Sequence, residues 1–323
     1  MSDRLSLAME AGLSAPDGAG AVVLWEPVVG FDLPDLTGAD PIVVHDKMPE
    51  AAQLQAAGFD VRQDLPTDNV ALGVTFVPRA KAAARDRIAR MAALADVVVV
   101  DGQKTDGIDS LLRDVRKRTE VAGTVSKAHG KAFWFSGGEF SDWLAADGVI
   151  DNRWHVRAGV FSADGVDPGS RLLADALTGG VAGRVADLGA GWGYLAGQVL
   201  AASPKITEMH LVEAQGTALD CARLNVTDAR AQFHWTDATD WRGAKNLDVV
   251  IMNPPFHTGR TKDLGLGQRF VQAAAALLRP RGQLFMVANR HLPYEATLTE
   301  VFAEVSEIAG DGRYKILHAR KQR

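Results

Sequence analysis

The sequence predicts an α/β protein made of two tandem Rossmann-like domains with doubly wound sheets, the N-terminal one degenerate. Through the second half, short strands that are apolar almost throughout alternate with helical segments. Such strands are typical of a parallel sheet covered by helices on both faces. A repeat supports a second copy, because residues 71–102 and 247–289 both run strand, proline, helix, strand. This similarity indicates an internal duplication in which residues 253–256 face residues 76–79.

The boundary is expected near residue 150, in a segment rich in Gly, Asp and Trp, which gives domains 1–150 and 151–323. In the second domain the expected strands are 183–188, 206–214, 231–235, 247–252 and 283–288, and the expected helices are 194–203, 215–229, 265–282 and 296–305. In the first domain the expected strands are 21–25, 41–45, 71–78, 96–102 and 131–136, and the expected helices are 51–58, 80–95 and 107–118. The first domain has no glycine-rich turn after its first strand, so we expect it to have lost the chemistry of the second.

The totals exclude several classes of protein. Apolar residues make up 47% and charged residues 23% of the 323 positions, which is typical of a globular chain. No apolar run approaches the roughly 20 residues that span a bilayer, and the N-terminus lacks the apolar core of a signal peptide. Cys221 is the single cysteine, which excludes a disulfide framework and a cysteine-based zinc cluster. We therefore expect a soluble, cytoplasmic protein with no metal site, and a monomer, because the duplication already pairs two folds.

A glycine-rich turn follows the strand 183–188. The motif "DLGAGWG" places Asp187, Gly189, Gly191 and Gly193 between this strand and a helix. Glycines permit positive φ and let the backbone approach a ligand closely, at the carboxyl edge of a parallel sheet. A dinucleotide site requires G-x-G-x-x-G, whereas the spacing here is G-x-G-x-G, and Asp187 would repel a pyrophosphate. An acid there suits a ligand with a positive end, and the predicted cofactor is S-adenosyl-L-methionine, which has a cationic sulfonium and no phosphate.

Two further acids follow the next strands in order. Glu213 ends the second strand, where a carboxylate can accept hydrogen bonds from both ribose hydroxyls, and Asp237 follows the third, where it can accept from the adenine amine. Any one of these acids alone can equally be a loop residue that caps a helix. Their positions at successive strand ends favour the cofactor site.

The fourth strand ends in Asn253, Pro254, Pro255 and Phe256. Proline fixes its own φ and disfavours helix in the preceding residue, so the Asn253 side-chain oxygen and the Pro254 carbonyl become two fixed acceptors. Two fixed acceptors suit a planar NH2 group, and Phe256 can stack on the ring that carries it. Polarisation and positioning of the amine then favour methyl transfer without a general base.

Two neighbouring side chains are less informative. His257 adjoins this loop, where a hydrogen-bonding role and an acid–base role both stay open. Cys221 lies on a predicted helix away from strand ends, so we expect it to pack in the core, which argues against cytosine-C5 methylation through a cysteine adduct.

These motifs together carry a family resemblance. "DLGAGWG", Glu213, Asp237 and "NPPFHTG" resemble class I methyltransferases that act on amino groups. With "GVFSADGVDPGSRLL" and "VANRHLPY", the region from Gly159 onward resembles the bacterial ribosomal RNA guanine-N2 methyltransferases, which include a type C for the small ribosomal subunit and a type G for the large one. The resemblance implies that residues 253–256 hold the target amine and that Asp187, Gly189, Gly191, Glu213 and Asp237 line the cofactor. It also implies a degenerate N-terminal domain that binds RNA or has a structural role.

The resemblance extends to less certain positions. Phe161 and Ser162 belong to a segment that, in the family, closes over cofactor and base. Residues 289–291 follow the fifth strand on the same rim, where Arg290 can contact RNA phosphate or form a structural salt bridge. Ribosomal RNA is the implied partner and requires positive charge. The candidates are Arg113, Arg116, Lys117, Arg118, Lys127 and Lys131 in the first half, and Arg313, Lys315, Arg320, Lys321 and Arg323 at the C-terminus.

Three alternatives stay open at the level of sequence. The same loop serves adenine-N6 methyltransferases, so the methylated amine is not fixed by it. A non-catalytic ribosome-assembly factor could retain the fold without the activity, and an NAD-dependent oxidoreductase is disfavoured by the glycine spacing. Both ribosomal subunits stay possible, with the run 287–292 favouring the large-subunit type.

Overall fold

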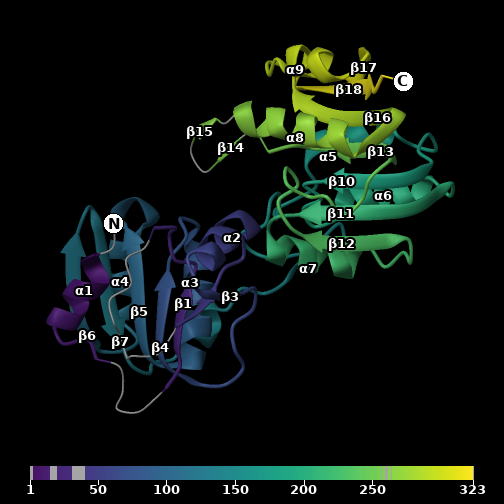
Figure 1. The fold of residues 1–323 in the computed structure, drawn as a ribbon. Helices are drawn as coiled ribbons and strands as arrows, with labels where there is room; N and C mark the ends of the chain where they lie inside the picture. Colours follow the sequence, from purple (N-terminus) through teal and green to yellow (C-terminus); the bar gives the residue numbers. More distant parts are fainter. Residues whose placement is uncertain are drawn as a thin grey trace. The chain divides into compact units, whose positions relative to one another are not determined.

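The structure is a computed structural model that describes residues 3–14, 20–30, 41–255, 257–258, 261–262 and 264–322. The chain divides into two compact units, Met1–Ala146 and Asp147–Arg323 (Figure 1). Each unit has its own sheet and its own buried apolar clusters on that sheet.

Unit 1 contains one mixed sheet with the strand order β3-β2-β1-β4-β5-β7-β6 in the part of the unit that the structure describes. Its strands are β1 (Val22–Trp25), β2 (Ile42–Val44), β3 (Asp60–Arg62), β4 (Val70–Phe76), β5 (Ala95–Gln103), β6 (Val121–Lys127) and β7 (Gly130–Phe135). Its helices are α1 (Asp3–Glu10), α2 (Met48–Ala56), α3 (Lys81–Leu94) and α4 (Ile108–Val115), with short 3-10 turns at Lys104–Asp106 and Ser141–Trp143. All seven residues of β4 are buried, as expected for a central strand covered on both faces.

Unit 2 contains a second mixed sheet, in the order β12-β11-β10-β13-β16-β18-β17. Its strands are β10 (Gly183–Leu188), β11 (Ile206–Glu213), β12 (Ala231–Trp235), β13 (Leu247–Met252), β16 (Leu278–Asn289), β17 (Glu304–Gly310) and β18 (Tyr314–Arg320). Short pairs form from β8 (Gly148–Ile150) with β9 (Trp154–Val156), and from β14 (His257–Thr258) with β15 (Thr261–Lys262). The helices are α5 (Pro168–Ala176), α6 (Tyr194–Ala202), α7 (Gly216–Asn225), α8 (Leu264–Leu277) and α9 (Tyr294–Val301).

The two sheets have the same topology. In each unit a helix precedes the central strand, α1 before β1 and α5 before β10. Each strand in the sheet of unit 1 has a counterpart at the same place in the strand order of the sheet of unit 2. The repeat found in the sequence is therefore a repeat of the fold, and the prediction of two Rossmann-like domains is confirmed.

The structure corrects several boundaries and one strand direction. Helix α4 ends at Val115 rather than near residue 118, and α7 ends at Asn225 rather than near residue 229. Helix α8 ends at Leu277 rather than near residue 282, because Pro280 disfavours helix before it and β16 already begins at Leu278. Helix α9 ends at Val301, and β17 follows. The sheet is also not wholly parallel: β18 runs antiparallel to β16 and β17, because only three residues separate the ends of β17 and β18.

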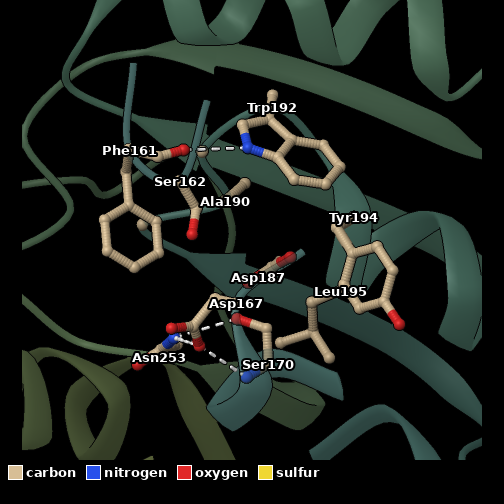
Figure 2. A pocket seen from close by; sticks show the side chains of 12 residues that line it. Phe161, Ser162, Asp167, Ser170, Asp187, Ala190, Trp192, Tyr194, Leu195 and Asn253 are labelled. Atoms are coloured by element: carbon tan, nitrogen blue, oxygen red, sulfur yellow. Dashed lines mark hydrogen bonds between the residues drawn. The ribbon is translucent and has the colours of Figure 1, made fainter. Parts of the chain in front are cut away.

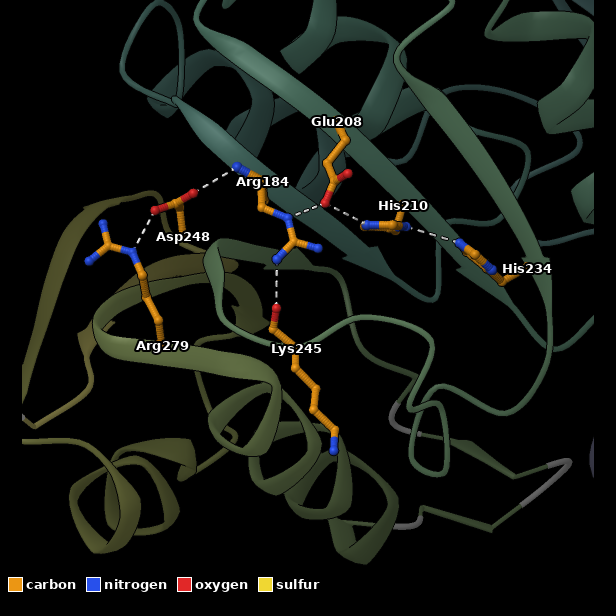
Figure 3. Close-up of polar contacts among 7 residues, drawn as sticks. All are labelled: Arg184, Glu208, His210, His234, Lys245, Asp248 and Arg279. Atoms are coloured by element: carbon orange, nitrogen blue, oxygen red, sulfur yellow. Dashed lines mark hydrogen bonds and ion pairs between the residues drawn. The ribbon is translucent and has the colours of Figure 1, made fainter.

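A chain of polar contacts links neighbouring strands of unit 2, from the amino ends of β10, β13 and β16 to the middle of β11 and to β12 (Figure 3). Its members are Arg184 in β10, Glu208 and His210 in β11, His234 in β12, Asp248 in β13 and Arg279 in β16, with the main-chain oxygen of Lys245. The Asp248 carboxylate accepts from the Arg184 main-chain N–H at 2.8 Å and from Arg279 Nε at 2.5 Å. These contacts fix the strand register at the end of the sheet opposite the glycine turn.

The end of β1 in unit 1 differs from the matching end of β10 in unit 2. The ladders with the next central strand stop at Trp25 in β1 and at Leu188 in β10, so Glu26 occupies the position of Gly189. Glu26 has a φ of 59°, the left-handed conformation that glycine favours. A large acidic side chain therefore stands where unit 2 has none.

The Glu26 carboxylate is satisfied within unit 1. It accepts from the Asp46 main-chain N–H at 2.6 Å, and its oxygens lie 3.2 Å from Arg87 and 3.8 Å from His45 Nδ1. Burial raises the pKa of this carboxyl, but the charges of Arg87, His45 and Lys47 and the hydrogen bond from the Asp46 main chain together outweigh burial and hold the pKa below its ordinary value. In unit 1 the position after the central strand is thus occupied by an ion-paired side chain of the unit itself.

Candidate active site

A pocket opens in unit 2 beside the glycine turn, beyond the ends of β10 and β13 (Figure 2). The empty space inside it, which includes open solvent, is about 420 Å³. The lining residues are Phe161, Ser162, Asp167, Ser170, Asp187, Gly189, Ala190, Gly191, Trp192, Tyr194, Leu195 and Asn253. The predicted cofactor turn and the predicted target-amine loop therefore meet at one pocket.

The glycines of the turn have different roles. Gly189, Gly191 and Gly193 have φ values of 76°, 55° and 86°, all in the left-handed region. A Cβ added at Gly191 would meet no atom within 4 Å, so this part of the backbone is open to a ligand. A Cβ at Gly193 would lie 2.9 Å from Val226 and 3.1 Å from Ala222, so that glycine lets α6 pack against α7.

Asp187 lies at the floor of the pocket and is only 1% exposed. Burial raises the pKa of its carboxyl to about 8, and the hydrogen bond from the Ala196 main-chain N–H, at 3.1 Å, opposes this rise. The nearby charge of Glu213 raises the pKa further. At pH 7 this carboxyl therefore holds a proton in the free protein, and a cation in the pocket would favour its ionised form.

The two other predicted cofactor acids do not line the pocket. Glu213, at the end of β11, accepts from the Gly191 main-chain N–H at 2.8 Å and from Gln215 at 2.7 Å. Asp237 follows β12 and accepts from the main-chain N–H and the hydroxyl of Thr239, both at 2.8 Å. Glu213 thus fixes the glycine turn directly, while Asp237 caps its own loop at the neighbouring strand end.

The target-amine loop starts where β13 ends. The Asn253 Nδ2 atom donates to Asp167 Oδ2 and to Ser170 Oγ, both at 2.9 Å. Pro254 is buried and Pro255 is exposed, and neither is among the residues that line the pocket. Phe256 lies outside the residues that the structure describes, as does the side chain of His257.

The matching position of unit 1 carries no amide. The last paired residues of β4 with β1 and of β13 with β10 are Thr75 and Met252, so Phe76 takes the place of Asn253. This register agrees with the sequence alignment of the two halves. Unit 1 therefore lacks the fixed amide acceptor.

Sequence reasoning missed Asp167 and Ser170. Asp167 precedes Pro168, and its carboxylate accepts from the Ser170 main-chain N–H at 2.7 Å, which caps α5. An aspartate before a helix-starting proline is a recognisable cap signal. Its contact with Asn253 is not, because the two residues meet only through the tertiary fold.

Phe161 and Ser162 do reach the pocket, although their place was inferred only from resemblance. Phe161 is 58% exposed at the pocket rim, and its carbonyl accepts from Trp192 Nε1 at 2.9 Å. Ser162 has a φ of 56°, a strained conformation for a residue with a side chain. The indole hydrogen bond thus ties the segment before the sheet to the glycine turn.

The structure separates the basic candidates for RNA contact. Arg290 pairs with Glu307 at 2.9 Å and also donates to the carbonyls of Asp311 and Tyr314, which makes it a structural residue. Lys315 is buried against Glu295.

Lys321 is also engaged internally, where it donates to the carbonyls of Ala275 and Leu278 at the end of α8. Arg323 lies beyond the described residues. The other candidates are exposed or half-buried, and four of them are ion-paired: Lys117 with Asp114, Arg118 with Asp142, Lys131 with Asp109 and Arg320 with Glu304.

Comparison with known families identifies the fold of unit 2. Residues 151–318, more than half of the chain, match the family model described as "Methyltransferase small domain". The chain belongs to this family. In the part of the chain that the structure describes, no helix is long and apolar enough to cross a membrane.

Relatives within the family are similar over most of the chain. A ribosomal RNA small subunit methyltransferase C from Salmonella arizonae is 33% identical over 234 residues, which cover 69% of this chain and 66% of that protein. The protein of the same name from Salmonella paratyphi A is 30% identical over 245 residues, covering 74% and 71% of the two chains. The match therefore spans about two thirds of each relative's length.

A solved structure is similar over both units. It is the T. thermophilus 16S rRNA N2 methyltransferase (RsmC) in complex with AdoMet and guanosine, with a TM-score of 0.76 and 26% sequence identity. The match covers 95% of this chain and 90% of that one. The tandem arrangement of two methyltransferase-like folds is thus shared with that enzyme.

Proposed function

We propose that this protein transfers a methyl group from S-adenosyl-L-methionine to the exocyclic N2 amine of a guanine in ribosomal RNA of the small subunit. The observation that carries the proposal is the meeting of the glycine turn and Asn253 at one pocket. The turn supplies an open backbone and a buried acid, and Asn253 supplies a fixed amide at the end of the adjacent strand.

The pocket suits the cofactor by its chemistry. Asp187 is a buried carboxyl that gains a partner when a cationic group enters, and Gly191 leaves room for close approach. Glu213 and Asp237 stand at the next two strand ends, and we assign them to accept from the ribose hydroxyls and the adenine amine. When bound, S-adenosyl-L-methionine supplies an electrophilic methyl group.

The chain's own part of the reaction is to hold and polarise the target amine. The Asn253 side-chain oxygen and the Pro254 carbonyl accept its two protons, which directs the nitrogen lone pair toward the methyl donor. Orientation of this kind contributes effective molarities of roughly 10⁵ M or more. Phe256 is assigned to stacking on the base, and the proton leaves after the methyl group arrives.

The choice of substrate is supported by the named relatives. Two relatives carry the name of the small-subunit methyltransferase C, and the similar solved structure contains guanosine. These names favour guanine over adenine as the base, and they favour the small subunit over the large-subunit type that residues 287–292 suggested. Arg113 and Arg116 on unit 1 are exposed and are the first candidates for RNA phosphate contact.

The test is to incubate the protein with radiolabelled S-adenosyl-L-methionine and rRNA, both naked and in 30S and 50S particles, beside Asn253→Ala. Nucleosides from the digested product are then identified. We expect N2-methylguanosine with the 30S particle or its rRNA, and a loss of at least about 100-fold in the variant. Label in N6-methyladenosine would keep the mechanism and overturn the substrate, and bound cofactor without labelled RNA would favour a non-catalytic assembly factor.

A further inference from the structure

The orientation of the Asn253 amide is determined by the groups that surround it (Figure 2). Its Nδ2 atom lies 2.9 Å from Asp167 Oδ2 and 2.9 Å from Ser170 Oγ. An ionised carboxylate can only accept hydrogen bonds, so the NH2 group of the amide must face Asp167. The Asn253 Oδ1 atom is then forced to the opposite side, away from both partners.

The two partners are themselves held in place. The Asp167 oxygen that accepts from Asn253 also accepts the Ser170 main-chain N–H at 2.7 Å, so the carboxylate is anchored as the cap of α5. Pro168 opens the helix with its fixed φ. Ser170 is only 9% exposed, which leaves its hydroxyl little freedom to find another partner.

We propose that Asp167 and Ser170 are positioning residues that select one of the two amide orientations of Asn253 and so present its oxygen to the target amine. This inference rests on the proposed function and adds a requirement to it. With the amide reversed, the Asn253 NH2 group would face the target amine. Both groups would then present N–H donors, and no hydrogen bond could form between them. The reversed orientation is therefore inactive.

The same contact explains why the loop begins with asparagine rather than aspartate. A carboxylate at position 253 would lie within hydrogen-bond distance of the Asp167 carboxylate, and two negative charges at that distance repel each other. Asn253→Asp is thus expected to fail even though it keeps an acceptor oxygen at this position. Asp167→Asn should restore a donor between the two positions, since its NH2 group can face the new carboxylate.

The test is a cycle of Asp167→Asn, Asn253→Asp and the double variant, assayed with the full chain on the RNA substrate that the wild type methylates. Asparagine caps a helix as well as aspartate does, so Asp167→Asn leaves α5 capped. The substitution removes the carboxylate, which can only accept hydrogen bonds, so either orientation of the Asn253 amide becomes possible. We therefore expect kcat to fall about tenfold. We expect Asn253→Asp to lose about 100-fold and the double variant to regain at least tenfold of that loss.

Two further variants separate positioning from stability. Ser170→Ala should lower kcat about tenfold, whereas Ser170→Thr, which keeps the hydroxyl, should restore it. Asp311→Asn is the matched control: Asp311 accepts the N–H of Tyr314, three residues ahead, at 2.7 Å, but it does not line the pocket. Its kcat should equal that of the wild type.

The readouts distinguish the possible outcomes. Cofactor affinity by calorimetry and the melting temperature should stay near wild type in the single variants. Asp167→Asn with unchanged kcat, or a double variant no faster than Asn253→Asp, would overturn the proposal. A change confined to cofactor affinity would instead make Asp167 a cofactor ligand and overturn it as well.

One measurement is independent of catalysis. Hydrogen exchange of the Asn253 side-chain NH2, followed by NMR on the free protein, should be slow in the wild type and faster in Ser170→Ala. Equal exchange rates in the two proteins would contradict the positioning role. This readout stays valid even if the wild type methylates a different acceptor, so failure of the proposed function and failure of this inference are distinguishable.

Discussion

At the scale of single residues, we expect Asp187 to make cofactor binding depend on pH. Its buried carboxyl has a pKa of about 8 in the free protein, well above its ordinary value. In the unfolded chain this carboxyl would ionise near pH 4, so the folded state retains a proton that the unfolded state has lost. The contribution to stability is therefore complete below about pH 4 and is lost as pH rises through about 8.

A cationic ligand beside Asp187 reverses this preference, because it favours the carboxylate. We expect S-adenosyl-L-methionine to bind with release of close to one proton at pH 7, and affinity to rise by up to about tenfold per pH unit from pH 6 to pH 7.5. Calorimetry in two buffers of different ionisation enthalpy measures this release. Asp187→Asn is the control and should bind more weakly without any proton release. A wild type that releases no proton would show that Asp187 is already ionised.

Contacts between single residues are also what the sequence predicts least well. Asp187, Gly189, Gly191 and Asn253 could be chosen because their types and positions at strand ends have a chemical reason. The partner Asp167 could not, because it is 86 positions from Asn253 and only the tertiary fold brings the start of α5 to the end of β13.

At the scale of elements, the glycine turn contains one position for the ligand and one for packing. Gly191→Ala should cost about 1–2 kcal/mol of stability, because a side chain in the left-handed region is strained, and should weaken cofactor binding. Gly193→Ala should cost more, about 2–4 kcal/mol, because its Cβ would also press on Val226 and Ala222. Denaturant unfolding and calorimetry measure the two effects. Equal losses of stability in both variants would contradict this division.

Apolar strands were predictable and exposed ones were not. The sequence places β10 and β13 at their observed bounds, because a strand buried in a parallel sheet is a continuous apolar run. The bounds of β12 also match, although none of its residues is buried. Strand β17 was read partly as helix, since five of its seven residues are exposed and no alternation marks it. It is held at the sheet edge by pairing with β18, a tertiary constraint that local composition does not record.

At the scale of the whole molecule, the two units have separate cores, so unit 2 has what an independent domain requires. We expect a fragment of residues 147–323 to bind S-adenosyl-L-methionine within about threefold of the full chain and to lose methylation of rRNA. RNA must be distorted to expose a base, at a cost of a few kcal/mol, and unit 1 is assigned to holding it. Full rRNA activity in a folded fragment, as judged by circular dichroism, would refute that assignment.

The ion-paired Glu26 has a consequence for how the molecule responds to the supply of its methyl donor. A protein that binds a metabolite is stabilised by it in proportion to the logarithm of its concentration. Unit 2 is subject to that dependence, whereas unit 1 carries a permanent occupant in its own chain at the position that corresponds to Gly189. We therefore expect the metabolite to stabilise unit 2 and to leave the stability of unit 1 unchanged, with one molecule bound per chain rather than two.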